Sequence, residues 1–249
     1  MSDVKTLILD IETFPTQAYV WGLYDQTVGI NQVIDSGGMM SFSAKWYGED
    51  DIYFSSTYHH GKEGMVAAIW EMLDEADEAV TCNGDKFDLR HINAQFMLAG
   101  YGHPSPYKKV DLLKVVRTNG KFLSNKLQFL SDAFKLGSKV ETGGFELWLD
   151  CMAGKKKAWN LLRTYNEQDV LLTERMYDKL LPWITTGVNR SSVNGTHVCP
   201  TCGGRHLQRR GYSRTVTQLY QRWQCRCGAW SRSRVSEKQE GKTQLVLAR

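Results

Sequence analysis

Carboxylate residues recur in three separated motifs of this 249-residue chain, and their spacing suggests chemistry more clearly than any other feature. Asp10 and Glu12 follow an apolar run, Asp88 follows a short polar segment, and Asp169 lies four residues after Tyr165. Acidic side chains gathered in one pocket repel each other unless cations lie between them, and carboxylate oxygens suit Mg²⁺ and Mn²⁺. If the fold brings the motifs together, they predict a divalent-metal site.

Local sequence patterns place the three motifs on regular elements. Strands are expected at 6–12, 18–23, 40–47, 51–55 and 78–82, helices at 63–76, 87–99, 124–136 and 158–181, and a strand passing into a helix at 110–116. Asp10 and Glu12 then project from the same face of the first strand, because side chains alternate along a strand. Tyr165 and Asp169 lie one turn apart on the last helix. The alternation of strands and helices predicts an α/β fold.

Each acidic motif also has an ordinary structural explanation when it is taken alone. An acid in the first turn of a helix, such as Asp88, is favoured by the helix dipole. Asp111 is explained at least as well by helix capping as by chemistry, and Asp85 reads as a loop acid. Only the ordered combination of the motifs favours function.

Paired cysteines near the C-terminal end predict a second metal site. The four residues are Cys199, Cys202, Cys225 and Cys227. A glycine follows each pair, and four thiolates at tetrahedral positions suit one structural Zn²⁺ in a small zinc ribbon. His197 or His206 could replace one thiol.

Basic charge is concentrated in the same part of the chain. Residues 188–249 hold 12 Lys and Arg but 2 Asp and Glu, whereas the whole chain has 31 and 27. A basic appendage on an acidic body indicates a polyanionic partner, although a solvated basic face is the alternative. Arginine binds phosphate and aromatic rings stack on bases, so the candidate nucleic-acid contacts here are Arg209, Arg210, Arg222 and Trp223.

We expect two folded domains joined by a linker. The expected parts are a catalytic-type domain at 1–185, a linker at 186–196, the zinc ribbon at 197–234 and a tail at 235–249, in which 245–247 could add a strand. No apolar stretch approaches the roughly 20 residues of a membrane span, and the first residues lack a signal-peptide pattern. We therefore expect a cytoplasmic protein with no membrane contact.

The ordered acidic motifs, with about 80 residues between successive acids, resemble those of the DEDD superfamily of 3′–5′ exonucleases. The resemblance covers roughly residues 5–182, and Tyr165 places the chain with the DEDDy branch. Residues 40–54 and 127–137 also look like the proofreading domains of family B DNA polymerases and their stand-alone bacterial and phage relatives. The resemblance implies a ribonuclease H-like mixed sheet flanked by helices.

The resemblance also implies roles for individual residues. The metal ligands would be Asp10, Glu12, Asp88 and Asp169, holding two Mg²⁺ or Mn²⁺ ions about 4 Å apart. One ion would generate hydroxide and the other would stabilise the leaving 3′-oxygen, while Tyr165 would orient the attacking water. Candidate contacts to the terminal nucleotide are Thr13, Phe14, Asn83 and Phe87, although core packing explains Phe14 equally well.

These observations favour a 3′–5′ exonuclease that acts on single-stranded ends, with the zinc ribbon holding the nucleic acid. DNA is preferred over RNA only because of the polymerase-like resemblance, so an exoribonuclease with the same site is the first alternative. A non-catalytic nucleic-acid-binding adaptor is the second, but retention of all four acids and Tyr165 argues against it. The expected partners are single-stranded DNA 3′ ends and proteins of replication or repair.

Overall fold

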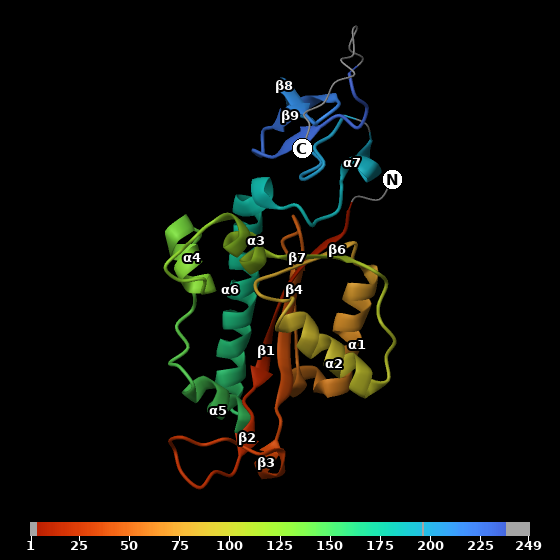
Figure 1. Ribbon diagram of the computed structural model, residues 1–249. Coiled ribbons are helices and arrows are strands. Elements are labelled where there is room, and N and C mark those ends of the chain that lie inside the picture. Colours follow the sequence, from red (N-terminus) through yellow and green to blue (C-terminus); the bar gives the residue numbers. More distant parts are fainter. Residues whose placement is uncertain (1–3, 196, 238–249) are drawn as a thin grey trace. The chain divides into compact units, whose positions relative to one another are not determined.

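The computed structural model describes residues 4–195 and 197–237 (Figure 1). Contacts divide the chain into a larger unit, residues 5–178, and a smaller unit that holds the remaining residues. Among the described residues, no helix is both long and apolar enough to cross a membrane.

A five-stranded mixed sheet forms the centre of the larger unit. Its strands in spatial order are β5 (Ile52–Ser56), β4 (Gly38–Trp46), β1 (Thr6–Phe14), β6 (Glu78–Thr81) and β7 (Lys108–Asp111). β1 pairs antiparallel with β4 and parallel with β6. The sheet confirms the expected α/β class, and the central strand is the one that carries the first acidic motif.

The two faces of β1 explain how this strand serves both the core and the site. Leu7, Leu9 and Ile11 lie on one face, within a buried cluster that includes residues of α1 and α2. Asp10 and Glu12 alternate with them and therefore point to the opposite face. A register shift between Glu12 and Thr13 marks the end of regular pairing with β4. The acids thus follow a buried apolar run and emerge where the strand becomes irregular.

Helices cover both faces of the sheet, as Figure 1 shows. The helices of the larger unit are α1 (Thr57–Glu75), α2 (Asp88–Ala99), α3 (Leu112–Asn119), α4 (Leu127–Phe134), α5 (Glu146–Met152) and α6 (Lys156–Leu180). α2 ends at Gly100 in the left-handed conformation, and α6 runs for 25 residues before Pro182. α1 and α2 pack on one face of β1, whereas α6 supplies residues that meet the acids on the other.

Three local expectations were wrong or incomplete. The strand expected at 18–23 is only the two-residue β2 (Gln17–Ala18), paired with an unexpected β3 (Val33–Asp35). Trp21 and Leu23 are 98% and 88% exposed, because the pairing with β3 ends at Ala18 and the residues after it have no neighbouring strand to pack against. α5 had no expected counterpart, and α4 ends at Lys135 in the left-handed conformation instead of reaching Gly137.

The smaller unit contains a three-stranded antiparallel sheet with β9 in the middle. Its elements are η2 (Leu181–Trp183), α7 (Ser191–Asn194), β8 (Leu207–Arg214), β9 (Leu219–Cys225) and β10 (Trp230–Arg232). The segment expected as a linker contains α7 and the buried Arg190, whose backbone N–H donates to Pro200 O at 2.8 Å. Glu237 N–H donates to Leu219 O, so the expected tail begins along β9. Residues 245–247 lie outside the described residues, and the domain boundaries stay predictions.

Candidate metal centres

The three acidic motifs meet at one hollow of about 520 Å³ in the larger unit. Its lining residues are Asp10, Ile11, Glu12, Cys82, Asn83, Phe87, Leu113, Arg117, Asn125, Lys126, Leu127, Lys139, Tyr165 and Asp169. Residues from β1, from the turn before α2 and from α6 therefore share one site. Three basic residues of this lining, Arg117, Lys126 and Lys139, were not anticipated from the sequence.

Three of the four expected ligands form a compact oxygen cluster. Asp10, Glu12 and Asp169 each offer a carboxylate oxygen, and these oxygens all lie within 4.8 Å of one another. The Oδ1 atom of Asp169 is buried and has no hydrogen-bond partner among the described residues. A buried acceptor without a donor is costly unless a ligand satisfies it. The cluster therefore fits a hard divalent cation.

Asp88 lies beside this cluster but outside it. It is the first residue of α2, it is 3% exposed, and its Oδ1 accepts a hydrogen bond from Ile11 N–H at 3.2 Å. Its carboxylate does not belong to the group of three close oxygens and it does not line the hollow. The structure thus shows Asp88 tied to the backbone of β1, and its role as a ligand stays a prediction.

Burial raises the pKa of all four carboxyl groups of the three motifs, namely Asp10, Glu12, Asp88 and Asp169. The pKa of Asp10 lies well above its ordinary value, first because of burial and then because of the charges of Asp88, Glu12 and Asp169. Burial and the charge of Asp169 raise the pKa of Glu12 to about 8. Burial raises the pKa of Asp88 to about 7. These acids would ionise together only beside additional positive charge.

Lys139 supplies part of that charge, and sequence reasoning missed it. Its ammonium group forms an ion pair with Asp169 and donates a hydrogen bond to Tyr165 Oη at 3.1 Å. Lys139 lies in an irregular segment between α4 and α5, 30 residues before Asp169, so no local pattern marks it. Burial and the charge of Asp169 raise the pKa of Tyr165 to about 12, which keeps its phenol neutral near pH 7.

Asn166 is a second residue that the sequence did not reveal. Its Nδ2 donates to Asp10 Oδ2 at 2.7 Å, and its Oδ1 accepts from Ser41 Oγ at 3.3 Å. The side chain is completely buried. Its position next to Tyr165 on α6 was the one available signal. Because it links β4, β1 and α6, Asn166 is a positioning residue for the Asp10 carboxylate.

Asp111 organises the turn that carries the second motif. Its Oδ1 accepts from the N–H groups of Asn83 and Leu113, both at 3.0 Å, and its Oδ2 accepts from Asp85 N–H at 3.3 Å. The helix-capping explanation is confirmed, and the same carboxylate also holds Asn83, whose φ is +78°. A Cβ atom at Gly84 would lie 2.1 Å from Thr81 Oγ1, so this turn requires glycine.

The expected nucleotide contacts fall into two groups. Asn83 and Phe87 line the hollow, and Phe87 is 38% exposed. Thr13 and Phe14 do not line it. Phe14 instead packs against a buried cluster, with its ring edge-on to Trp159 at 6.4 Å, as the core-packing alternative predicts. A contact of Thr13 or Phe14 with the substrate stays a prediction.

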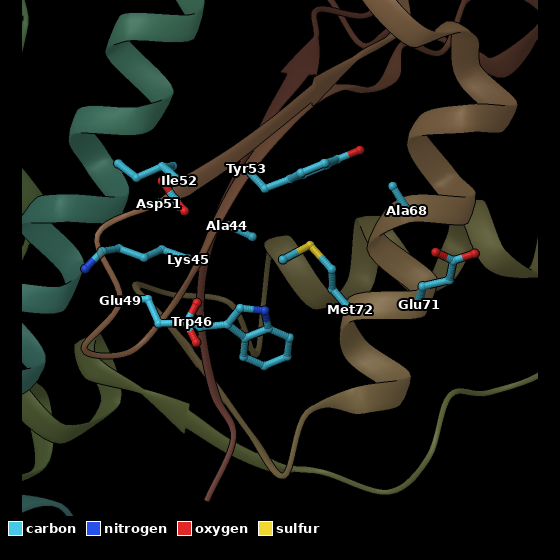
Figure 2. Close-up of a pocket in the computed structure, with 10 residues that line it drawn as sticks. All are labelled: Ala44, Lys45, Trp46, Glu49, Asp51, Ile52, Tyr53, Ala68, Glu71 and Met72. Carbon is cyan, nitrogen blue, oxygen red and sulfur yellow. The ribbon is translucent and has the colours of Figure 1, made fainter. Parts of the chain in front are cut away.

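A second hollow of about 310 Å³ lies between the sheet and α1 (Figure 2). Three carboxylates line it, from Glu49, Asp51 and Glu71. They do not form a group of three oxygens close enough to share a metal within the described part of the chain. Figure 2 shows Lys45 pointing away from Met72, and its ammonium group pairs with Glu174 on α6 at 2.6 Å. Of these two hollows, the first is therefore the one whose acids form a group that could hold a divalent metal.

The four cysteines of the smaller unit form a separate cluster. Their sulfur atoms all lie within 4.8 Å of one another, and neither His197 nor His206 belongs to the group. The Sγ atoms of Cys199 and Cys227 are 3.8 Å apart, and those of Cys202 and Cys225 are 3.6 Å apart. A tetrahedral ion with Zn–S bonds of about 2.3 Å places its sulfurs about 3.8 Å apart. The cluster therefore fits Zn²⁺.

The structure separates the four nucleic-acid contacts that were expected in the ribbon. Arg209 and Trp223 are directly opposite each other on β8 and β9, with the guanidinium 5.9 Å from the ring centre. Arg222 lies on the other face of β9, because side chains alternate along the strand. Arg210 donates a hydrogen bond to Gln208 at 3.0 Å. The expected set is thus not one continuous surface.

Comparison with known proteins agrees with this geometry. The model of the RNase H superfamily matches residues 7–181, so the chain belongs to this superfamily. Among solved structures, the chain is similar to the family B DNA polymerase from the hyperthermophilic archaeon Pyrobaculum calidifontis, with a TM-score of 0.56 and 15% identity. The match covers 73% of this chain and 25% of the polymerase, so this chain spans about a quarter of it. No curated protein sequence matches. The superfamily and the acidic cluster support nuclease activity on nucleic acid.

Proposed function

We propose that this protein is a DEDDy-type 3′–5′ exonuclease that removes nucleotides from single-stranded DNA ends. The observation that carries the proposal is the cluster of Asp10, Glu12 and Asp169 oxygens within 4.8 Å, in a hollow that Tyr165 also lines. The likeness to a family B DNA polymerase supports DNA over RNA. An exoribonuclease with the same site is the first alternative, since none of the motifs reads a 2′-hydroxyl.

The chain's own residues have distinct roles in this proposal. Two Mg²⁺ or Mn²⁺ ions would be held by Asp10, Glu12, Asp169 and Asp88, and such ions lower the pKa of bound water and stabilise charge on the leaving oxygen. Asn166 fixes the Asp10 carboxylate through its 2.7 Å hydrogen bond.

Tyr165 and two basic residues of the hollow act on the attacking water and the substrate in this proposal. The raised pKa of Tyr165 makes it a neutral hydrogen-bonding group, so it orients the attacking water and does not act as a base near pH 7. Arg117 and Lys126 offer positive charge to the phosphates of the bound strand. Asn83 and Phe87 line the hollow and contact the terminal nucleotide.

The smaller unit is proposed to be a zinc ribbon that holds the nucleic acid. Its contacts are drawn from the residues expected from the sequence, namely Arg209, Arg210, Arg222 and Trp223. A cytoplasmic location and partners in replication or repair belong to the same proposal. A non-catalytic adaptor remains the alternative of a different class, and only an activity assay separates it from the enzyme.

The decisive experiment uses purified protein with Mg²⁺ or Mn²⁺ on DNA and RNA that are labelled at either end. With 5′-labelled single-stranded DNA, we expect a ladder of shortened labelled strands. With 3′-labelled DNA, we expect labelled mononucleotide from the first turnover. Asp10→Ala and Asp169→Ala should abolish both products and leave the fold intact.

Asp51→Asn is the matched control, because Asp51 is an acid that lines the second hollow and lies outside the metal cluster. It should cleave DNA at the wild-type rate. Internal cuts, full activity of the Asp10 or Asp169 variant, or equal loss in the control would each overturn the site assignment.

A further inference from the structure

The three-stranded sheet of the smaller unit has two chemically different faces. Directly opposite residues share a face, and so do alternate residues along one strand. Gln224 is opposite both Gln208 and Trp230, and Arg222 is opposite Arg232. We use the term arginine–aromatic face for Gln208, Tyr220, Arg222, Gln224, Trp230 and Arg232. Five of these six residues, all but Arg222, were not among the candidate contacts expected from the sequence, and Trp230 is 51% exposed.

Two cation–π pairs order this face. The Arg222 guanidinium lies 4.7 Å from the ring centre of Trp230, and that of Arg232 lies 4.3 Å from the ring centre of Tyr220. Each pair joins diagonal neighbours on adjacent strands, a separation that long and aromatic side chains span. Guanidinium planes and aromatic rings are both surfaces on which unpaired bases stack. The face therefore offers preformed stacking surfaces that carry positive charge.

Among the described residues, no acidic side chain neutralises the charge on this face. Glu237 is the single acidic residue within residues 197–237, and its carboxylate lies 4.0 Å from the guanidinium of Arg209. Arg209 is opposite Trp223 and therefore lies on the other face, where it also donates a hydrogen bond to Gln221. No described acidic residue pairs with Arg222 or Arg232. Positive charge without a counterion favours a polyanionic ligand.

The arginine–aromatic face continues into a hollow of about 440 Å³. The hollow is lined by Arg205, His206, Leu207, Gln208, Gln224, Cys225 and Arg226. Side-chain amides both donate and accept hydrogen bonds, which lets them pair with base edges. The arginines of this hollow could contact phosphates, and the amides of Gln208 and Gln224 could form hydrogen bonds with the edge of a base.

We propose that the arginine–aromatic face binds single-stranded nucleic acid through its bases. Bases stack on Trp230, Tyr220 and the paired guanidinium groups, phosphates contact Arg222 and Arg232, and Gln224 bonds to base edges in the adjoining hollow. The inference rests on the proposed function in one respect, that nucleic acid is the substrate. It goes beyond that function because it assigns strand binding to one particular face of the ribbon sheet, with five residues not proposed before, and because it specifies base stacking as the mode of recognition.

The test measures equilibrium binding and needs no turnover. The full chain carrying Asp10→Asn is titrated, without added divalent metal or chelator, against a labelled thymidine strand of about 15 nucleotides and an abasic strand of the same length. Trp230→Ala should weaken binding of the thymidine strand by roughly 5- to 100-fold and change binding of the abasic strand less than about twofold. Zinc content and circular dichroism show whether each variant is folded.

Two arginines on opposite faces provide the matched control. Arg222→Ala removes an arginine of the arginine–aromatic face, whereas Arg214→Ala removes an exposed arginine opposite Leu219 on the other face. The first should lower the slope of binding against salt by about 0.7 and the second should leave it unchanged. Equal effects of the two changes would overturn the proposal, because binding would then follow net charge alone.

If Trp230→Ala lowered the affinity for the thymidine strand and for the abasic strand equally, the proposal would also be overturned, since the effect would not involve bases. If Trp230→Ala fails to fold, Trp230→Leu and Tyr220→Leu replace it with the same expected contrast between the two strands. A protein that binds as expected but cleaves nothing would refute the proposed enzyme and leave this inference standing. A protein that cleaves DNA but shows no difference between the Arg222 and Arg214 variants would support the proposed enzyme and refute this inference.

Discussion

Replacing Glu12 by glutamine makes the strongest prediction about the acidic hollow, because the change has opposite effects with and without metal. The Glu12 side chain is half-buried and its carboxylate shares its surroundings with those of Asp10 and Asp169. Without a cation, ionising it adds repulsion and loses hydration, which raises its pKa from 4.5 to about 8. Glutamine has nearly the same shape and carries no charge. Metal-free Glu12→Gln protein should therefore be more stable than the wild type at high pH.

The size and sign of the effect follow from the pKa. Because Glu12 binds its proton more tightly in the folded than in the unfolded protein, wild-type stability falls as the pH rises from 4.5 to about 8. Each pKa unit corresponds to about 1.4 kcal/mol, so the penalty grows to roughly 3 to 5 kcal/mol above pH 8 and vanishes below pH 4. Removing the carboxyl group removes the penalty together with its pH dependence.

Urea unfolding at about pH 4 and pH 9, on metal-free protein, measures this effect. We expect equal stabilities at the low pH and a more stable Glu12→Gln variant at the high pH. Adding Mg²⁺ at about 100 times its dissociation constant should stabilise the wild type by about 2.7 kcal/mol and the variant far less. Glu49→Gln, an exposed acid on the second hollow, serves as control and should show neither effect.

A Glu12→Gln protein less stable than the wild type at pH 9 would refute the reasoning. So would a gain of equal size at both pH values, because the repulsion argument requires an ionised carboxylate.

The remaining predictions concern residues around the metals. Asn166→Ala removes the 2.7 Å hydrogen bond to Asp10 and should weaken Mn²⁺ binding by about tenfold or more, which calorimetric titration measures; unchanged affinity would contradict its positioning role. Lys139→Gln leaves Asp169 without its cation and should destabilise the metal-free protein by roughly 2 to 4 kcal/mol, with a smaller loss at saturating Mg²⁺. A loss of stability that is the same with and without Mg²⁺ would show that the ion pair does not compete with metal. Cys199→Ser should abolish bound zinc in elemental analysis, and zinc retained at the wild-type level would exclude this cluster as its site.

Local sequence patterns were sufficient for the elements that carry the acids. The apolar run before Asp10 predicted the buried strand β1, and the helical periodicity up to Pro182 predicted α6. Both patterns describe how side chains point from their own backbone, with a period of two or 3.6 residues. The same rule placed Asp10 with Glu12 and Tyr165 with Asp169 on shared faces, and the structure brings all four into one hollow.

Local composition predicted too long a strand where the fold supplies no neighbouring strand. Residues 18–23 have the composition of a strand, yet only Gln17–Ala18 pairs with another strand. A strand exists only where a neighbour supplies hydrogen bonds and packing, which composition does not specify. Phe14 packs with Trp159, as the core-packing explanation of this residue predicts, and its contact with the terminal nucleotide stays a prediction.

The sequence by itself determined the α/β class, pointed to the three acids that the structure brings together, Asp10, Glu12 and Asp169, and gave the spacing of the four cysteines. Tertiary structure alone decided that Lys139 pairs with Asp169, that Asn166 holds Asp10, and that Asp88 bonds to β1 outside the compact cluster. It also decided which arginines of the ribbon share a face, since a register shift between Arg209 and Tyr212 interrupts the alternation along β8. The physical reason is that local periodicity fixes a side chain's direction from its own backbone. Which distant groups meet depends on how the elements pack.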